Sequence, residues 1–277
     1  TVANKKNVDL LKFKPGKAID LDVLEEKLKS KKYDVVTFTH NETSTGVIND
    51  MVKVCKLIQK YGAMALVDGV SIFGGMKIPF EEAKPSIYVT STQKCLGLPA
   101  GFGVIFVHKD ALEKAKTVEN RGYVTDLVSI AESAQKSQTV TTPNCTLINQ
   151  MEEQLKYIVE EEGIDNRFKR HEEMQKMVSD WVENSLSDDF KFFSQEGYYS
   201  PVVSAIEIPK YVDRMAIKEN LREKGYLFDP GYGGLNKKLE ESGENLNIRI
   251  GHMGDITPEM LSKYLKELEI ELKKFKP

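Results

Sequence analysis

Segments with the hydrophobic pattern of a strand alternate with segments of helical pattern along the first half of the chain. Helical spacing of apolar residues predicts helices over residues 22–31 and 47–61, and Gly62 ends the second one. Short apolar runs predict buried strands at 34–39, 63–67, 86–90 and 103–107. This alternation is typical of an α/β protein with a mainly parallel sheet flanked by helices.

The pattern changes after Pro143. Long helices are predicted over residues 145–162 and 166–186, the second one burying Phe168, Met177, Val178 and Trp181. Strands are predicted near 202–208 and 246–250, with helices at 213–224 and from Thr257, an N-cap followed by Pro258. We therefore predict a large α/β domain over residues 1–155 and a smaller C-terminal α+β domain over residues 156–277.

Composition and charge exclude several classes of protein. The 277 residues include 39 Lys and Arg against 42 Asp and Glu, which argues against a nucleic-acid partner held by bulk basicity. Apolar runs fall short of the ~20 residues of a membrane span, and no secretory signal pattern is present. Three cysteines and four histidines are too scattered for a disulfide framework or a metal site. A cytoplasmic protein without membrane association is expected.

Polar residues follow three of the predicted strands. A hydroxyl cluster at residues 43–45 follows the first strand, Asp68 follows the second, and Lys94 with the Gly/Pro loop 95–101 follows the third. Open α/β sheets bind ligands at the carboxyl ends of their strands. Taken singly, the hydroxyls and Asp68 could be caps and Lys94 a surface lysine. In this order, they indicate one shared site.

A lysine and a carboxylate brought together at strand ends suit pyridoxal phosphate chemistry. The cofactor needs a lysine amine for a Schiff base, and it needs an anion beside its pyridinium nitrogen. Lys94 and Asp68 are the candidates for these two roles.

Four stretches of the chain carry a family resemblance. The sequence resembles class V, fold-type-I aminotransferases of the alanine–glyoxylate and serine–pyruvate family. The matching stretches occur in the family's order and are residues 39–46, 67–75, 91–101 and 247–254.

The resemblance implies a set of cofactor contacts within the large, cofactor-binding domain. Lys94 is then the catalytic Schiff-base lysine, and Asp68 pairs with the pyridine nitrogen. Gln93 contacts the cofactor phosphate, Val70 packs on the ring face, and Thr43 lies near the ring hydroxyl.

Two further roles follow from the same resemblance. Arg249 matches the arginine that binds the substrate α-carboxylate, a role that suits a planar guanidinium because it pairs bidentately with a carboxylate. Thr141 matches a threonine that reaches the phosphate site of the neighbouring subunit, which implies a homodimer.

The expected function is transfer of an amino group from a small amino acid, such as alanine or serine, to a 2-oxo acid, such as glyoxylate or pyruvate. One alternative is a lyase of the cysteine desulfurase type, which needs a reactive thiol on an exposed loop. Cys55, Cys95 and Cys145 do not have that pattern. The other is a non-catalytic fragment of the fold, against which Asp68, Lys94 and Arg249 argue.

Family members normally begin well before the segment that matches Thr1. We expect the chain to lack an N-terminal segment that carries a glycine-containing phosphate cradle and an aromatic residue that stacks on the ring. On that expectation, the 277-residue chain alone binds pyridoxal phosphate weakly or not at all.

Overall fold

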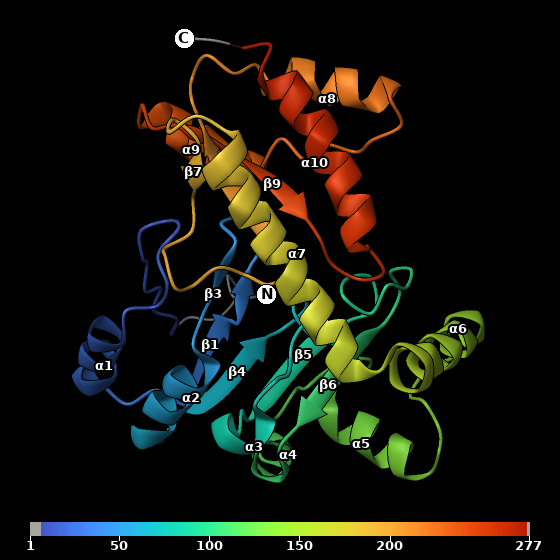
Figure 1. The fold of residues 1–277 in the computed structure, drawn as a ribbon. Coiled ribbons are helices and arrows are strands. Elements are labelled where there is room, and N and C mark those ends of the chain that lie inside the picture. Colours follow the sequence, from blue (N-terminus) through green and yellow to red (C-terminus); the bar gives the residue numbers. More distant parts are fainter. Residues whose placement is uncertain (1–6, 276–277) are drawn as a thin grey trace.

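Four strands form the larger sheet of the computed structural model, which describes residues 7–275. They lie in the order β1-β4-β5-β6 (Figure 1). Strands β1, β4 and β5 are parallel, and β6 runs antiparallel to β5. The four predicted strands are therefore present in a mainly parallel sheet. Their bounds are Val35–Thr39 (β1), Met64–Asp68 (β4), Ile87–Ser91 (β5) and Gly103–Val107 (β6).

Helices α1 (Leu21–Ser30) and α2 (Met51–Lys60) bury their apolar faces with β4 and β5 in one hydrophobic cluster. Helices α3 (Phe80–Ala83), α4 (Lys109–Lys116) and α5 (Leu127–Gln135) complete this half of the chain. Apolar side chains from α2 and β4 form the centre of the cluster: Met51, Val54, Ile58, Ala65 and Val67.

The predicted helix over residues 47–61 starts four residues later than expected. Asp50 caps α2 by accepting a hydrogen bond from the Lys53 backbone N–H at 2.9 Å. The preceding Val47–Ile48 forms strand β3, which pairs antiparallel with β2 (Asn41–Glu42). Apolar periodicity alone does not distinguish a helical first turn from a short paired strand. Here the residues before Asp50 form the paired strand.

The second half of the chain builds an antiparallel sheet in the order β7-β8-β9. Its strands are Lys191–Phe192 (β7), Val203–Ile208 (β8) and Leu246–Gly251 (β9). Helices α8 (Arg214–Glu223), α9 (Gly233–Glu241) and α10 (Pro258–Leu272) surround it. Thr257 caps α10 as predicted, and α9 and β7 were not predicted.

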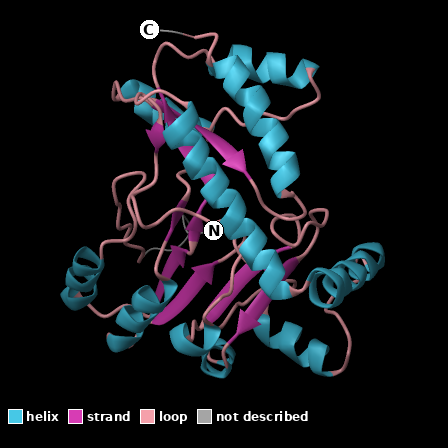
Figure 2. Ribbon diagram, in the orientation of Figure 1, coloured by secondary structure: helices cyan, strands magenta, loops and turns pink. Residues whose placement is uncertain are grey.

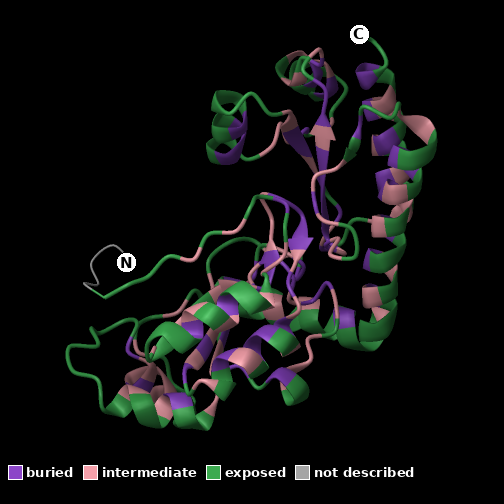
Figure 3. Cartoon of the chain, turned by 90° about the vertical axis from the view of Figure 1, so that its left-hand side faces the viewer, coloured by how far each residue is buried: buried purple, intermediate pink, exposed green. Residues whose placement is uncertain are grey.

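A long helix, α7 (Ile164–Ser185), runs from the larger sheet to the smaller one (Figures 1 and 2). Helix α6 (Cys145–Lys156) precedes it and continues into a π-helical turn over Tyr157–Glu162. Gly163, with φ of 79°, then separates this turn from α7. Figure 3 shows buried residues on the strands of both sheets.

The β2–β3 hairpin joins the two sheets. The Gly46 carbonyl accepts a hydrogen bond from Ser200 N at 2.9 Å, and Ile48 N donates to the Tyr198 carbonyl at 2.9 Å. A Cβ on Gly46, whose φ is 68°, would lie 2.9 Å from the Ala205 backbone nitrogen. The turn of the β2–β3 hairpin is therefore fixed against β8 of the smaller sheet.

Candidate active site

Asp68 ends β4 at the edge where the parallel strands of the larger sheet terminate. The register pairs Thr39 of β1 with Asp68, and Asp68 with Val89 of β5. The Asp68 carboxylate is exposed, and its Oδ1 accepts a hydrogen bond from the Val70 backbone N–H at 3.0 Å. The side chain therefore faces outward from the carboxyl edge of the sheet and is oriented by the turn that follows it.

Gly69 allows this turn to pass directly over a buried aromatic ring. A Cβ at this position would lie 1.9 Å from Cζ of Tyr88, which is fully buried. The Tyr88 hydroxyl lies 3.4 Å from Nδ1 of His40. Burial lowers the pKa of His40 from 6.5 to about 4, so the ring is neutral near pH 7. The support beneath Asp68 is thus closely packed and uncharged.

Lys94 lies in a tight turn that continues β5 beyond Ser91. The Lys94 carbonyl accepts a hydrogen bond from Gly97 N at 2.9 Å, and Thr92 closes the loop by donating from Oγ1 to the Pro99 carbonyl at 2.7 Å. The Lys94 side chain is half-buried, whereas Gln93 is exposed. The loop therefore has internal hydrogen bonds that determine where the lysine leaves the backbone.

Arg249 on β9 reaches across to the turn of the β2–β3 hairpin. Its Nη1 donates to the Thr43 carbonyl at 3.2 Å, and its Nη2 pairs with Asp229 Oδ2 at 2.7 Å. A second contact between the same segments joins Asn247 Nδ2 to the Ser44 carbonyl at 3.3 Å. Thr43 and Arg249, 206 positions apart in sequence, are therefore neighbours.

Asp229 was missed by the sequence analysis. It precedes Pro230 and Gly231 and reads as an ordinary turn residue, because its long-range partner is not visible in the local pattern. In the structure it forms an isolated bridge with Arg249, and the Arg249 backbone N–H donates to its carbonyl at 3.1 Å.

Two adjacent strands thus bring Asp68 and Val70 to the same sheet edge as the Lys94 loop, and a direct hydrogen bond joins Arg249 to Thr43. Thr141 lies apart from them in sequence, in an exposed segment between α5 and α6. The Thr141 carbonyl accepts a hydrogen bond from Thr139 Oγ1 at 2.7 Å. The role of Thr141 across a subunit interface stays a prediction.

The chemistry of these side chains fits pyridoxal phosphate. An amine and a carboxylate follow neighbouring parallel strands, as the aldehyde and the pyridine nitrogen of that cofactor require. Several buried polar atoms within residues 7–275 have no hydrogen-bond partner, and Ser91 Oγ and Arg249 Nε are two of them. Buried polar groups are normally paired, and these two lie close in sequence to Lys94 and within the proposed carboxylate-binding guanidinium.

The cysteines do not resemble a reactive loop thiol. Burial raises the pKa of both Cys55 and Cys95 to about 12, which suppresses their thiolate forms near neutral pH. Cys145 is exposed, but it is the first residue of helix α6.

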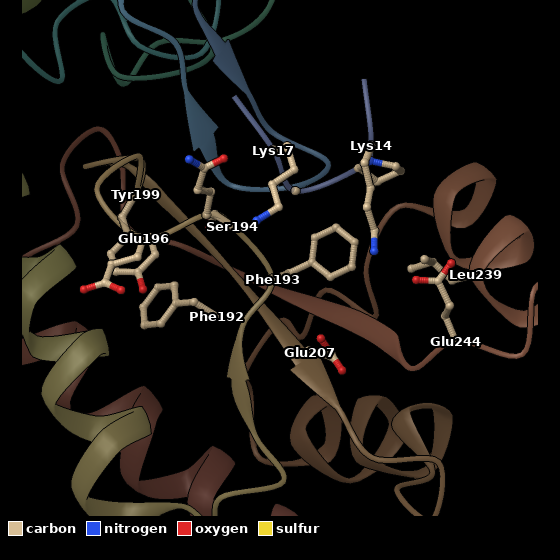
Figure 4. Close-up of a pocket in the computed structure, with 13 residues that line it drawn as sticks. Lys14, Lys17, Phe192, Phe193, Ser194, Glu196, Tyr199, Glu207, Leu239 and Glu244 are labelled. Carbon is tan, nitrogen blue, oxygen red and sulfur yellow. The ribbon is translucent and has the colours of Figure 1, made fainter. Parts of the chain in front are cut away.

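A cavity of about 360 Å³ lies elsewhere, between the segment before α1 and the smaller sheet. Figure 4 shows Lys14 and Lys17 extending from that segment toward β7 and β8. None of the predicted site residues lines it.

No helix within residues 7–275 has the length and apolar character needed to cross a bilayer.

Comparisons with known proteins now identify the family. The model of the class-V aminotransferase family matches residues 1–228. An aminotransferase of Methanocaldococcus jannaschii is 31% identical over 279 residues, covering 96% of this chain and 69% of that protein. A 2-aminoethylphosphonate–pyruvate transaminase of Bacillus mycoides is 28% identical, covering 87% of this chain and 63% of that protein.

Solved structures show the same fold. Pyridoxamine–pyruvate aminotransferase from Mesorhizobium loti superposes with a TM-score of 0.81 at 27% identity, covering 94% of this chain and 65% of that one. Ureidoglycine–glyoxylate aminotransferase from Bacillus subtilis gives 0.85 at 24% identity, covering 97% and 68%. The chain thus spans about two thirds of the length of these proteins. The predicted family and fold-type-I class are confirmed, and this chain belongs to the class-V aminotransferase family.

Proposed function

We propose that the chain carries the active site of a pyridoxal-phosphate-dependent transaminase. It moves the amino group of a small amino acid, such as alanine or serine, to a 2-oxo acid such as glyoxylate or pyruvate. The family match supports the reaction class, and the names of several relatives include pyruvate or glyoxylate as the partner substrate.

The observation that carries this proposal is the meeting of three chain segments. Parallel strands β4 and β5 deliver Asp68 and the Lys94 loop to one edge of the sheet. Strand β9 of the other sheet brings Arg249 to the turn of the β2–β3 hairpin, where it donates a hydrogen bond to the Thr43 carbonyl. An anion, an amine and a guanidinium are the groups that cofactor activation and recognition of an amino acid require.

Each residue has a distinct proposed task. Bound pyridoxal phosphate supplies a protonated aromatic ring that accepts electrons from the substrate Cα. With the cofactor bound, the Lys94 amine would hold it and would move the proton at the substrate Cα. The Asp68 carboxylate would keep a proton on the ring nitrogen. Val70 would pack against the ring, and Thr43 would lie beside its hydroxyl.

Phosphate binding and assembly complete the proposal. Gln93 and Thr141 are both exposed, so they are accessible to groups from outside the chain. We assign Gln93 to the phosphate of its own subunit and Thr141 to that of the partner subunit, which makes the active form a homodimer. A cytoplasmic location stays a prediction from the sequence.

The test is a transamination assay with alanine or serine as donor, glyoxylate or pyruvate as acceptor, and saturating cofactor. The variant Lys94→Arg should lose turnover, and Asp68→Asn should lower kcat about a hundredfold because the ring nitrogen loses its anionic partner. The exposed Lys109→Arg is the matched control and should retain full activity. Sulfide release from cysteine at a rate above that of transamination would favour the lyase instead.

A further inference from the structure

A fully buried arginine contacts the backbone carbonyl of Cys95, the residue that follows Lys94. Arg167 lies in the first turn of α7 with 0% of its side chain exposed. Its Nη2 donates a hydrogen bond of 2.7 Å to the carbonyl oxygen of Cys95. Burying a guanidinium is costly unless it is fully engaged, so this position calls for an explanation.

Two carboxylates balance the Arg167 charge from different parts of the chain. Nη1 pairs with Glu162 in the turn that precedes α7, and Nη2 pairs with Asp255 Oδ1 at 2.9 Å. Asp255 also accepts two hydrogen bonds from Gln154 Nε2, at 3.0 and 3.1 Å. The guanidinium therefore joins the Lys94 loop, helix α7 and the segment that follows β9.

Two glycines allow these segments to approach closely. A Cβ on Gly97 would lie 2.6 Å from Asp255 Oδ2, and a Cβ on Gly254 would lie 3.2 Å from the Lys94 carbonyl oxygen. Both residues have φ of 74°, which disfavours other residue types. The segment from Arg249 to Asp255 thus packs on the Lys94 loop at the point where Arg167 holds both.

We propose that Arg167 is a positioning residue for Lys94. By bonding to the Cys95 carbonyl and to Asp255 together, Arg167 fixes the direction in which the Lys94 side chain leaves its loop relative to β9, the strand of Arg249. This proposal rests on the proposed function, because that function makes Lys94 the Schiff-base lysine. The effect of Arg167 on the Lys94 amine can still be measured without cofactor. Misplacing a reacting group by about 1 Å can cost on the order of a hundredfold in rate.

The planar guanidinium suits this task and an ammonium does not. Arg167 makes three directed contacts with Glu162, Asp255 and Cys95 from two nitrogens. Lysine keeps the charge but presents one nitrogen on a flexible stem, so it cannot reproduce these contacts together. Arg167→Lys therefore retains the charge while releasing the loop, which makes it the most informative variant.

The experiment measures the Lys94 amine directly, without cofactor. Competitive labelling with trace acetic anhydride, followed by peptide mass analysis, gives the reactivity of each lysine as a function of pH. In Arg167→Lys, we expect the position and accessibility of the Lys94 amine to change, so that its labelling rate at pH 8 differs from wild type by at least about threefold. The rate at Lys17 serves as the internal reference.

Two further variants separate positioning from general destabilisation. Asp255→Asn leaves Arg167 in place, and Asp255 is 49% exposed, so the variant should fold and change Lys94 labelling in the same direction to a smaller extent. Arg121→Lys weakens another arginine–carboxylate pair, with Asp126, and should leave Lys94 labelling unchanged. Thermal unfolding of each variant checks that the labelled protein is folded.

The same proteins are then incubated with pyridoxal phosphate and reduced with borohydride. Arg167→Lys should capture the cofactor on Lys94 about tenfold more slowly than Arg121→Lys. If Lys94 is labelled at the wild-type rate in both Arg167→Lys and Asp255→Asn, and both variants are folded, the positioning role is overturned. Altered Lys94 labelling, without any capture by the wild-type chain at saturating pyridoxal phosphate, would support the positioning role and contradict the proposed function.

Discussion

Arg249 forms an ion pair with Asp229, with 2.7 Å between Nη2 and Oδ2. The guanidinium that we assign to the substrate carboxylate is therefore already shared with a carboxylate of the chain. Asp229 is 42% exposed, so solvent screens the pair and a substrate can compete for it. Asp229 thus orients Arg249. An incoming substrate carboxylate must compete with Asp229 for the guanidinium.

Replacing Asp229 by Asn should strengthen the binding of carboxylate substrates. The amide can still accept a hydrogen bond from Arg249, but it removes a competing negative charge worth about 1 kcal/mol at this exposure, or about fivefold in affinity. The measurement is the KM for the 2-oxo acid. Arg249→Lys is the counterpart and should raise that KM, because bidentate pairing is lost. An unchanged or higher KM in Asp229→Asn would show that orientation outweighs competition.

Gly69→Ala should destabilise the fold by about 1–3 kcal/mol, because its Cβ would overlap the buried Tyr88 ring at 1.9 Å. The free energy of unfolding in urea measures the effect. Gly233→Ala is the matched control, since a Cβ there meets nothing within 4 Å and the residue opens helix α9. Equal stabilities for the two variants would contradict the close packing beneath Asp68.

The three thiols should react at very different rates. Cys55 and Cys95 are buried with a pKa raised to about 12 by desolvation, whereas Cys145 is exposed. A thiol reagent at pH 8 should therefore modify one cysteine per folded chain and all three in urea. Cys145→Ser should remove the fast reaction and leave transamination unchanged. Rapid modification of Cys95 in the folded chain would be the opposite result.

Stability should fall as the pH falls from about 6.5 toward 4. Burial lowers the pKa of His40 and His171 from 6.5 to about 4, and that of His252 to about 3. In this range the unfolded chain binds protons that the folded chain does not, so each histidine costs up to about 1.4 kcal/mol per pH unit. Stability is fully present above pH 6.5 and declines below it.

Urea unfolding at pH 7, 6 and 5 gives the slope. His171→Gln should reduce the slope by about one third, because one of the three buried histidines no longer titrates. His108→Gln is the control, since His108 is partly exposed. A flat stability between pH 7 and 5 would contradict the neutral, buried state of these rings.

The local sequence pattern predicts the site residues that lie at or near the end of a strand. Asp68 and Lys94 could be proposed from sequence because Asp68 ends one apolar run, Lys94 lies three residues beyond another, and parallel strands share one carboxyl edge. The start of α2 could not be predicted from the sequence, because Val47 pairs with Glu42 instead of entering the helix. Whether Val47 joins a strand or the helix depends on this pairing partner, which helical periodicity does not encode.

The missed residues depend on partners far away in the chain. Asp229 looks like a turn residue until β9 places Arg249 beside it. Arg167 does carry a sequence signal, because it lies at helical spacing from His171, Met174 and Trp181 on the buried face of α7. A charged residue on an apolar helical stripe indicates a buried ion pair, although the stripe does not reveal that the partner is the Lys94 loop.

The most direct test is to locate the covalent cofactor. The chain is incubated with pyridoxal phosphate, reduced with borohydride and digested, and the modified peptide is identified by mass. We predict one modified site, Lys94, whose labelling is abolished in Lys94→Arg and weakened in Asp68→Asn. Modification spread over surface lysines, or unchanged after removal of Lys94, would contradict the account.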